Sequence, residues 1–136
     1  MVVASGEQVT SGLLAMTLRN MGLDARSWMG WQVPIVTDDA HGRARIVDIP
    51  AAKLGAALDA GQIAVIPGFQ GVTPESKITT LGRGGSDTSA VAVAAALECP
   101  CDIYTDVDGV YTTDPRIESR ARRLNRISFC LLYTSD

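Results

Sequence analysis

The stretch PAAKLGAALDAGQIAVIPG, residues 50–68, contains a helix signal that is followed at once by a strand signal. Pro50 favours the start of a helix, and Gly61 favours its end. The next segment, QIAVIPG, is a continuous apolar run of the kind found in strands that are buried on both faces. A helix that leads directly into a buried strand is the repeating unit of α/β proteins.

Helix and strand patterns also alternate on both sides of this stretch. The expected elements are a helix within residues 7–22 that stops at Gly22, short strands at 24–28 and 44–49, a loop from about 68 to 85, a helix of small residues from about 87 to 97, a strand at 101–107, and a turn with a short extended piece at 108–116. This alternation predicts an α/β fold with a parallel or mostly parallel sheet and helices on both of its faces.

Composition narrows the function classes. The chain has 136 residues, of which 46% are hydrophobic and 20% are charged, as expected for one globular core. A net charge of −3 gives no electrostatic reason to expect nucleic acid or a membrane as a partner. The arginines concentrated in residues 116–126 are interpreted as a solvated face. The odd number of cysteines, without metal-like spacing, predicts a reducing, cytoplasmic compartment.

Three segments are predicted to meet at one edge of the sheet. They are VVASGEQ at 2–8, the region from IPGFQG to GRGGSD at 66–87, and TDVDGVY at 105–111. In each, an expected strand leads into Gly, Ser or Asp. Because ligands of open α/β sheets bind at the carboxyl ends of the strands, this edge is the predicted active site.

The glycine turn at residues 82–87, GRGGSD, has the composition of an anion site. Glycines let backbone N–H groups approach a ligand, and the following helix start adds unpaired N–H groups and partial positive charge. Arg83 adds a guanidinium that grips a carboxylate or phosphate with two hydrogen bonds. Ser86 or Asp87 is expected to cap the helix. The Ala and Val residues that follow would let this helix pack closely on the sheet.

Taken together, the motifs resemble those of aspartate kinases in the amino-acid kinase family. The resemblance rests on VVASGEQVT at 2–10, PGFQG at 67–71, GRGGSDTSAVAVAAAL at 82–97 and IYTDVDGVYTTDPR at 103–116. It implies a three-layer α/β/α sandwich around a largely parallel sheet. It also implies the transfer of phosphate from ATP, with Mg²⁺, to the side-chain carboxylate of L-aspartate, which opens lysine, threonine and methionine synthesis. A homo-oligomer is implied for the full-length protein.

The resemblance also implies roles for individual residues. Arg83 would bind the aspartate carboxylate, with Gly84, Gly85 and Ser86 in the same substrate loop, and Glu7 would meet the ammonium group. Asp87 would organise the cationic groups at the catalytic centre. The residues that match the nucleotide-binding segment are Thr105, Asp106, Tyr111 and Arg116. Two alternatives stay open: Glu7 could be a first-turn helix acid, and TDVDG could be a plain acidic turn.

Some features depart from the family pattern. The Lys-Phe-Gly-Gly phosphate loop and the regulatory ACT domains are not found, and neither Lys53 nor Lys77 matches a catalytic lysine. We therefore expect residues 1–129 to be a partial, incomplete catalytic domain that is inactive by itself. The ending CLLYTSD, residues 130–136, resembles translated sequencing adapter and is expected to be foreign.

Two rival functions remain at this point. One is another kinase of the same fold, such as glutamate 5-kinase or uridylate kinase. The other is a binding module without catalysis that senses an amino acid or a nucleotide.

Overall fold

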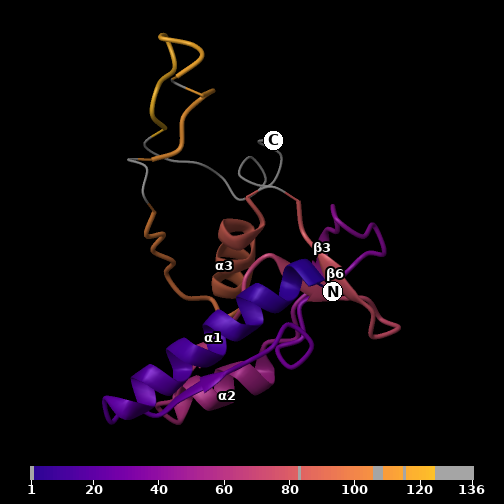
Figure 1. Cartoon of the computed structure of the whole chain (residues 1–136), viewed down its shortest axis with the longest axis vertical. Coiled ribbons are helices and arrows are strands. Elements are labelled where there is room, and N and C mark those ends of the chain that lie inside the picture. The colour runs from indigo at the N-terminus through magenta and orange to yellow at the C-terminus, as the bar shows by residue number, and fades with distance from the viewer. Residues whose placement is uncertain (1, 83, 106–108, 115, 125–136) are drawn as a thin grey trace. The chain divides into compact units, whose positions relative to one another are not determined.

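A computed structural model describes residues 2–82, 84–105, 109–114 and 116–124. The chain divides into two compact units, Met1–Cys101 and Asp102–Asp136 (Figure 1).

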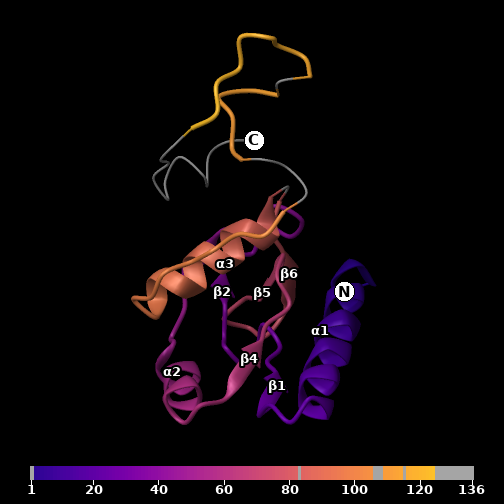
Figure 2. The same ribbon diagram turned by 90° about the vertical axis from the view of Figure 1, so that its left-hand side faces the viewer.

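The first unit contains the helices and strands of an α/β fold. In chain order these are α1 (Val2–Asn20), β1 (Ala25–Ser27), β2 (Val36–Thr37), β3 (Ile46–Asp48), α2 (Ala52–Asp59), β4 (Ile63–Val65), β5 (Gln70–Val72), β6 (Ile78–Thr80) and α3 (Gly85–Ala96). Helix α1 lies on one side of the strands, while α2 and α3 lie on the other (Figure 2). The fold class predicted from the alternating pattern is therefore confirmed, and this unit has the expected α/β/α layers.

The strands form two small sheets. In the first, β1 and β4 pair in parallel, with Ala25 opposite Ile63. The second has the order β3-β2-β5-β6. Its central pair, β2 and β5, is parallel, whereas β2–β3 and β5–β6 are antiparallel. The described strands thus form a parallel and a mixed sheet, where a largely parallel sheet was expected. The hairpin β5–β6 corrects the prediction of a loop over 68–85, because these short strands lie among Gly, Thr and Pro residues that are typical of loops.

Local signals fix the ends of two helices. Helix α1 ends just before Gly22, and α2 ends just before Gly61, and both glycines have φ near +85°. This backbone conformation suits glycine because it has no Cβ atom. The start of α1 was placed too late: residues 2–8, expected to follow a strand, are already helical.

A small apolar core lies between the layers. Its buried members are Trp28, Val33, Ile35 and Leu54. The prediction that the strand in 62–68 is buried on both faces is wrong. Ile63 is 37% exposed, and Ala64 and Val65 are only half-buried, so the described elements cover the faces of this strand incompletely.

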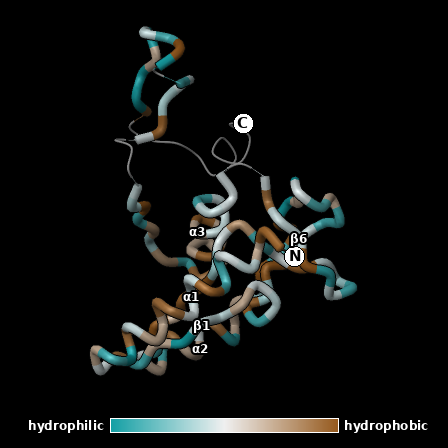
Figure 3. The backbone as a smooth tube through the Cα atoms, viewed as in Figure 1, coloured by the Kyte–Doolittle hydropathy of each residue, from teal (hydrophilic) through white to brown (hydrophobic). Residues whose placement is uncertain are grey.

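Helix α1 packs on β1 and β4 through small side chains. Ala4, Ser11 and Ala15 are buried, whereas larger apolar side chains such as Leu13 and Met16 are exposed. Hydrophobic residues are accordingly spread along this helix (Figure 3). No helix in the described part of the chain is long and apolar enough to cross a membrane.

The second unit has little regular structure among its described residues. The strand expected at 101–107 is wrong for residues 101–105, which span the end of the first unit and the start of the second and are exposed and not part of a strand; residues 106 and 107 lie outside the described residues. Further on, Tyr111 and Arg123 form an antiparallel bridge. The Leu124 N–H donates to the Val110 carbonyl at 2.8 Å, so two short extended pieces lie side by side.

Candidate functional site

The glycine turn brings the chain into α3 through a left-handed residue. Gly84 has φ +72° and occupies the N-cap position of α3. Gly85 is buried as the first helical residue, and a Cβ atom there would lie 2.8 Å from Leu81 Cβ. Positions 84 and 85 thus need glycine for different reasons, one for its conformation and the other for lack of space. Arg83 lies outside the described residues.

The predicted cap at Ser86 or Asp87 is wrong. The helix begins before both residues, and its N-cap has no side-chain hydrogen bond. Both side chains instead lie exposed in the first turn of α3. A helix start leaves the first backbone N–H groups without partners inside the helix, and these groups favour an anion. The geometry therefore keeps Ser86, Asp87 and the first turn of α3 open to a ligand.

The PGFQG segment packs directly against this turn. A Cβ atom at Gly68 would lie 3.1 Å from Ser86 Cα, and Phe69 has a positive φ of 68°. The Phe69 N–H donates to Ser89 Oγ at 3.1 Å, and the Leu81 N–H donates to the Phe69 carbonyl at 2.9 Å. Two parts of the predicted edge, 66–71 and 82–87, are therefore in contact.

The start of α1 joins the same cluster through Gln70. Gln70 Nε2 donates to the Ala4 carbonyl at 3.3 Å, and Gln8 Nε2 donates to Gln70 Oε1 at 2.8 Å. Glu7 lies next to Gln8 and is exposed. The alternative that Glu7 is a first-turn acid is wrong, because α1 begins at Val2 and has no acidic residue in its first turn.

Sequence reasoning missed the residues that join these segments. Gln70 and Ser89 are both buried polar side chains, and each bonds to a different helix or turn. The signal was present, because a Gln inside the expected strand-to-loop region and a Ser inside an Ala-Val helix both interrupt apolar runs. Such interruptions indicate buried hydrogen bonds when the position faces the core.

The expected nucleotide segment lies in the second unit. Thr105 is exposed, Tyr111 is half-buried in its bridge to Arg123, and Asp106 lies outside the described residues. Arg116 is paired with Asp114, its Nη2 lying 2.8 Å from Asp114 Oδ2. The hydrogen bonds from Arg116 lower the pKa of Asp114 to about 2. An anionic ligand of Arg116 would therefore compete with Asp114.

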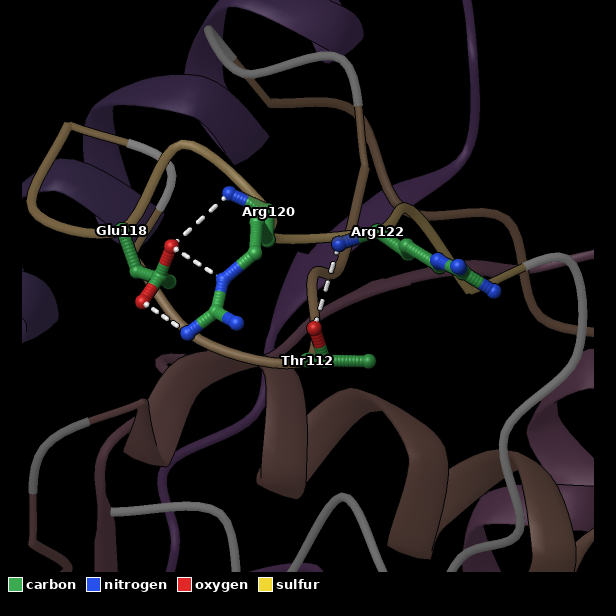
Figure 4. A network of polar contacts seen from close by, with 4 residues as sticks. All are labelled: Thr112, Glu118, Arg120 and Arg122. Carbon is green, nitrogen blue, oxygen red and sulfur yellow. Dashed lines mark hydrogen bonds and ion pairs between the residues drawn. The ribbon is translucent and has the colours of Figure 1, made fainter.

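A second arginine in this unit is paired in the same way. Arg120 donates from its backbone N–H and its guanidinium to Glu118, and these bonds lower the pKa of Glu118 (Figure 4). Nearby, the Arg122 N–H donates to Thr112 Oγ1 at 3.1 Å. The side chains of Arg116 and Arg120 are each 88% exposed. The prediction of a solvated arginine face is thus confirmed for these two residues, while Arg126 lies outside the described residues.

No group of three or more His, Cys, Asp or Glu side chains suited to a metal occurs in the described ranges. Mg²⁺ is commonly held by one or two carboxylates together with the phosphates of a nucleotide. Asp87 is an exposed carboxylate in the first turn of α3. Cys99 and Cys101 are free and exposed.

Residues 1–134 match the model of the amino acid kinase family. The chain belongs to the amino acid kinase family. Among curated proteins, this family member is 56% identical over 130 residues to Aspartokinase 2 of Bacillus subtilis and 57% identical over 129 residues to an aspartate kinase of Pseudomonas fluorescens. These matches cover 95% and 94% of the chain but 32% and 31% of the relatives, so it spans about a third of their length.

Solved structures give the same family. Aspartokinase III of E. coli, in complex with aspartate and ADP, matches with a TM-score of 0.74 and 38% identity. The match covers 88% of this chain and 28% of the E. coli chain. An isopentenyl phosphate kinase matches with a TM-score of 0.52 and 28% identity, covering 82% of this chain and 43% of its own. The α/β amino-acid kinase fold is therefore shared with kinases that act on different acceptors.

Proposed function

We propose that this chain provides the substrate-binding part of an aspartate kinase, which transfers the γ-phosphoryl group of ATP to the side-chain carboxylate of L-aspartate. The observation that carries the proposal is the identity of 50–57% to aspartokinases over about 95% of the chain. The first product would be 4-phospho-L-aspartate, and the reaction would open lysine, threonine and methionine synthesis.

The geometry of the first unit supports this substrate. L-Aspartate carries an ammonium group at one end and two carboxylates, so its site needs an anion near one part and cations or N–H groups near another. Glu7 on α1 supplies the anion, and the turn at 82–87 with the first turn of α3 supplies groups that favour anions. Gln70 bonds to Ala4 and Gln8 on α1, and Phe69 bonds to Ser89 on α3, so the PGFQG segment is bonded to both helices.

The mechanism needs no protein nucleophile. The side-chain carboxylate of aspartate is ionised at neutral pH and would attack the γ-phosphorus itself. The difficulty is to bring one anion to another, so catalysis depends on positioning and on neutralisation of charge. Arg83 would hold a substrate carboxylate in this scheme, and Gly84, Gly85 and Ser86 would line the same loop.

ATP and Mg²⁺ are the proposed cofactors. Asp87 would organise the cationic groups at the catalytic centre, and Mg²⁺ would shield the phosphate charge when it is bound. Thr105, Asp106, Tyr111 and Arg116 would contact the nucleotide. For Arg116 this means exchanging Asp114 for a phosphate, and both groups are exposed enough for the exchange. We further propose a cytoplasmic homo-oligomer as the working form.

Other acceptors are less well supported. Glutamate 5-kinase and uridylate kinase remain alternatives by fold alone, as the isopentenyl phosphate kinase match illustrates. A binding module without catalysis gains no support from the curated relatives, which are named as kinases.

The test is a chimera in which residues 1–129 replace the matching segment of Bacillus subtilis Aspartokinase 2. With ATP, Mg²⁺ and hydroxylamine, we expect hydroxamate from L-aspartate and none from L-glutamate, with no phosphorylation of uridylate. Preference for either other acceptor would refute the proposal.

A further inference from the structure

The side chain of Gln70 is buried and held at both ends. It is 1% exposed in β5, and its amide lies against the first two turns of α1. The Ala4 carbonyl only accepts hydrogen bonds, so it must face Gln70 Nε2. Gln70 Oε1 is then left to accept from Gln8 Nε2, which fixes the orientation of both amides.

Phe69, which precedes Gln70 in the chain, bonds to a different helix. Phe69 is joined to α3 through its N–H, which donates to Ser89 Oγ, and Ser89 Oγ donates to the Gly85 carbonyl at 2.7 Å. Residues 69 and 70 therefore bond to α3 and to α1, respectively. One dipeptide thus links the helix that carries Glu7 to the turn that precedes α3.

The strand that carries this dipeptide has little freedom to shift. A Cβ atom at Gly71 would overlap the Thr37 side chain and lie 2.7 Å from the Ile35 carbonyl oxygen. On the other side, a Cβ atom at Gly30 would lie 3.5 Å from the Gln70 carbonyl oxygen. Because the backbone of β5 is closely packed, it has little room to move. A change in the Gln70 side chain is therefore expected to shift α1 and not the strand.

We propose that Gln70 is a positioning residue, which sets the place of Glu7 relative to the glycine turn at 82–87. The inference rests on the proposed function, because it assigns the two ends of aspartate to these two parts. Gln70 itself is buried and does not touch substrate; it acts through Ala4, Gln8 and the helix between them. A displacement of about 1 Å in a positioned group costs on the order of 100-fold in rate in favourable cases, so such a link matters.

The test uses the chimera and its Gln70→Met variant, which conserves volume but removes both amide bonds. We expect the aspartate KM to rise about tenfold, equivalent to about 1.4 kcal/mol, with little change in the ATP KM. In a Glu7→Ala background the same substitution should add less than about twofold, because the two residues act as a unit. Gln8→Leu, on the half-buried face of α1, should give a smaller rise of the same kind.

Thr79→Val is the matched control. It removes the buried hydrogen bond between Thr37 Oγ1 and Thr79 Oγ1, which lie 2.6 Å apart in the same sheet. It should reduce stability without raising the aspartate KM selectively.

Equal effects of Gln70→Met on both KM values, or full additivity with Glu7→Ala, would overturn the positioning role while leaving the proposed function intact. If Gln70→Met fails to fold, an unchanged aspartate KM in Gln8→Leu would overturn it. An unsubstituted chimera that does not phosphorylate aspartate would overturn both.

Discussion

The ring of Phe69 lies against the backbone of Gly85, so that a Cβ atom at position 85 would come 3.0 Å from Phe69 Cδ2. Phe69 itself has a left-handed backbone, and its carbonyl accepts from the Leu81 N–H. This contact joins the PGFQG segment to the start of α3.

Gly85→Ala should therefore destabilise the first unit. The added methyl group would overlap Leu81 and Phe69, and overpacking of this kind costs about 1–3 kcal/mol. Gly82→Ala is the control, because a Cβ atom there would meet nothing within 4 Å and no positive φ is required. Chemical denaturation of both variants measures the difference. Equal stability of the two variants would show that a Cβ atom fits at position 85, which would contradict the structure.

Arg83→Ala in the chimera should raise the aspartate KM by at least about tenfold, because hydrogen bonds to charged groups contribute about 1.5–3 kcal/mol each. Arg83→Lys should restore binding only in part, since an ammonium group does not reproduce the planar fork of a guanidinium. The ATP KM should change much less. An unchanged aspartate KM in Arg83→Ala would remove this residue from the proposed site.

The Asp114–Arg116 pair predicts a specific titration. Hydrogen bonds from Arg116 hold the pKa of Asp114 at about 2, below its ordinary 3.8. Because the pKa is lower in the folded state, the stabilisation is present above about pH 3.8 and is lost as the pH falls through about 2. NMR titration of the Asp114 carboxyl should show this value, and Arg116→Gln should return it toward 3.8. A carboxyl that titrates normally in the unsubstituted protein would contradict the pairing.

Residues 130–136 lie outside the described residues, and we propose that they are foreign to the kinase sequence, although the family match extends to residue 134. Their deletion from the 136-residue chain should leave its melting temperature unchanged. The genomic sequence of the source provides the independent check. A locus that encodes CLLYTSD in frame would refute the proposal.

Some of the fold was predictable because its signals are local. The ends of α1 and α2 follow from single glycines, and the alternation of helix and strand patterns gives the α/β class. The hairpin β5–β6 was missed because its strands are three residues long, and their pairing depends on neighbours distant in sequence. The cap of α3 was wrongly predicted because the helix begins earlier than expected, after Gly84, which has no side chain that could cap it.

The candidate site was predictable in part, because some of its signals are also local sequence motifs. Motif spacing identified the turn at 82–87 and the PGFQG segment, and the structure brings them into contact. The role of Gln70 was not predictable, because only the folded chain places its amide between Ala4 and Gln8. The 102–136 segment forms a separate unit, so its nucleotide contacts remain predictions from resemblance.

The 136-residue chain by itself should not phosphorylate aspartate. Neither of its two lysines matches a catalytic lysine of the family: Lys53 Nζ is 6.0 Å from the Trp28 ring centre, and Lys77 is exposed in the turn between β5 and β6. Loss of one preorganised donor costs on the order of 10²–10³ in kcat. The hydroxamate assay on the purified chain should therefore give no product, and clear product would show that its own arginines neutralise the phosphate charge.

The most direct measurement observes the carboxyl group that is proposed to accept the phosphoryl group. The chimera is incubated with ATP, Mg²⁺ and L-aspartate labelled with ¹³C at the side-chain carboxyl carbon, and ¹³C NMR records that carbon. We expect its resonance to shift and to split through coupling to phosphorus, because the proposed product is an acyl phosphate at this carboxylate. ATP consumption with an unshifted, unsplit resonance would contradict the assignment of aspartate as the phosphoryl acceptor.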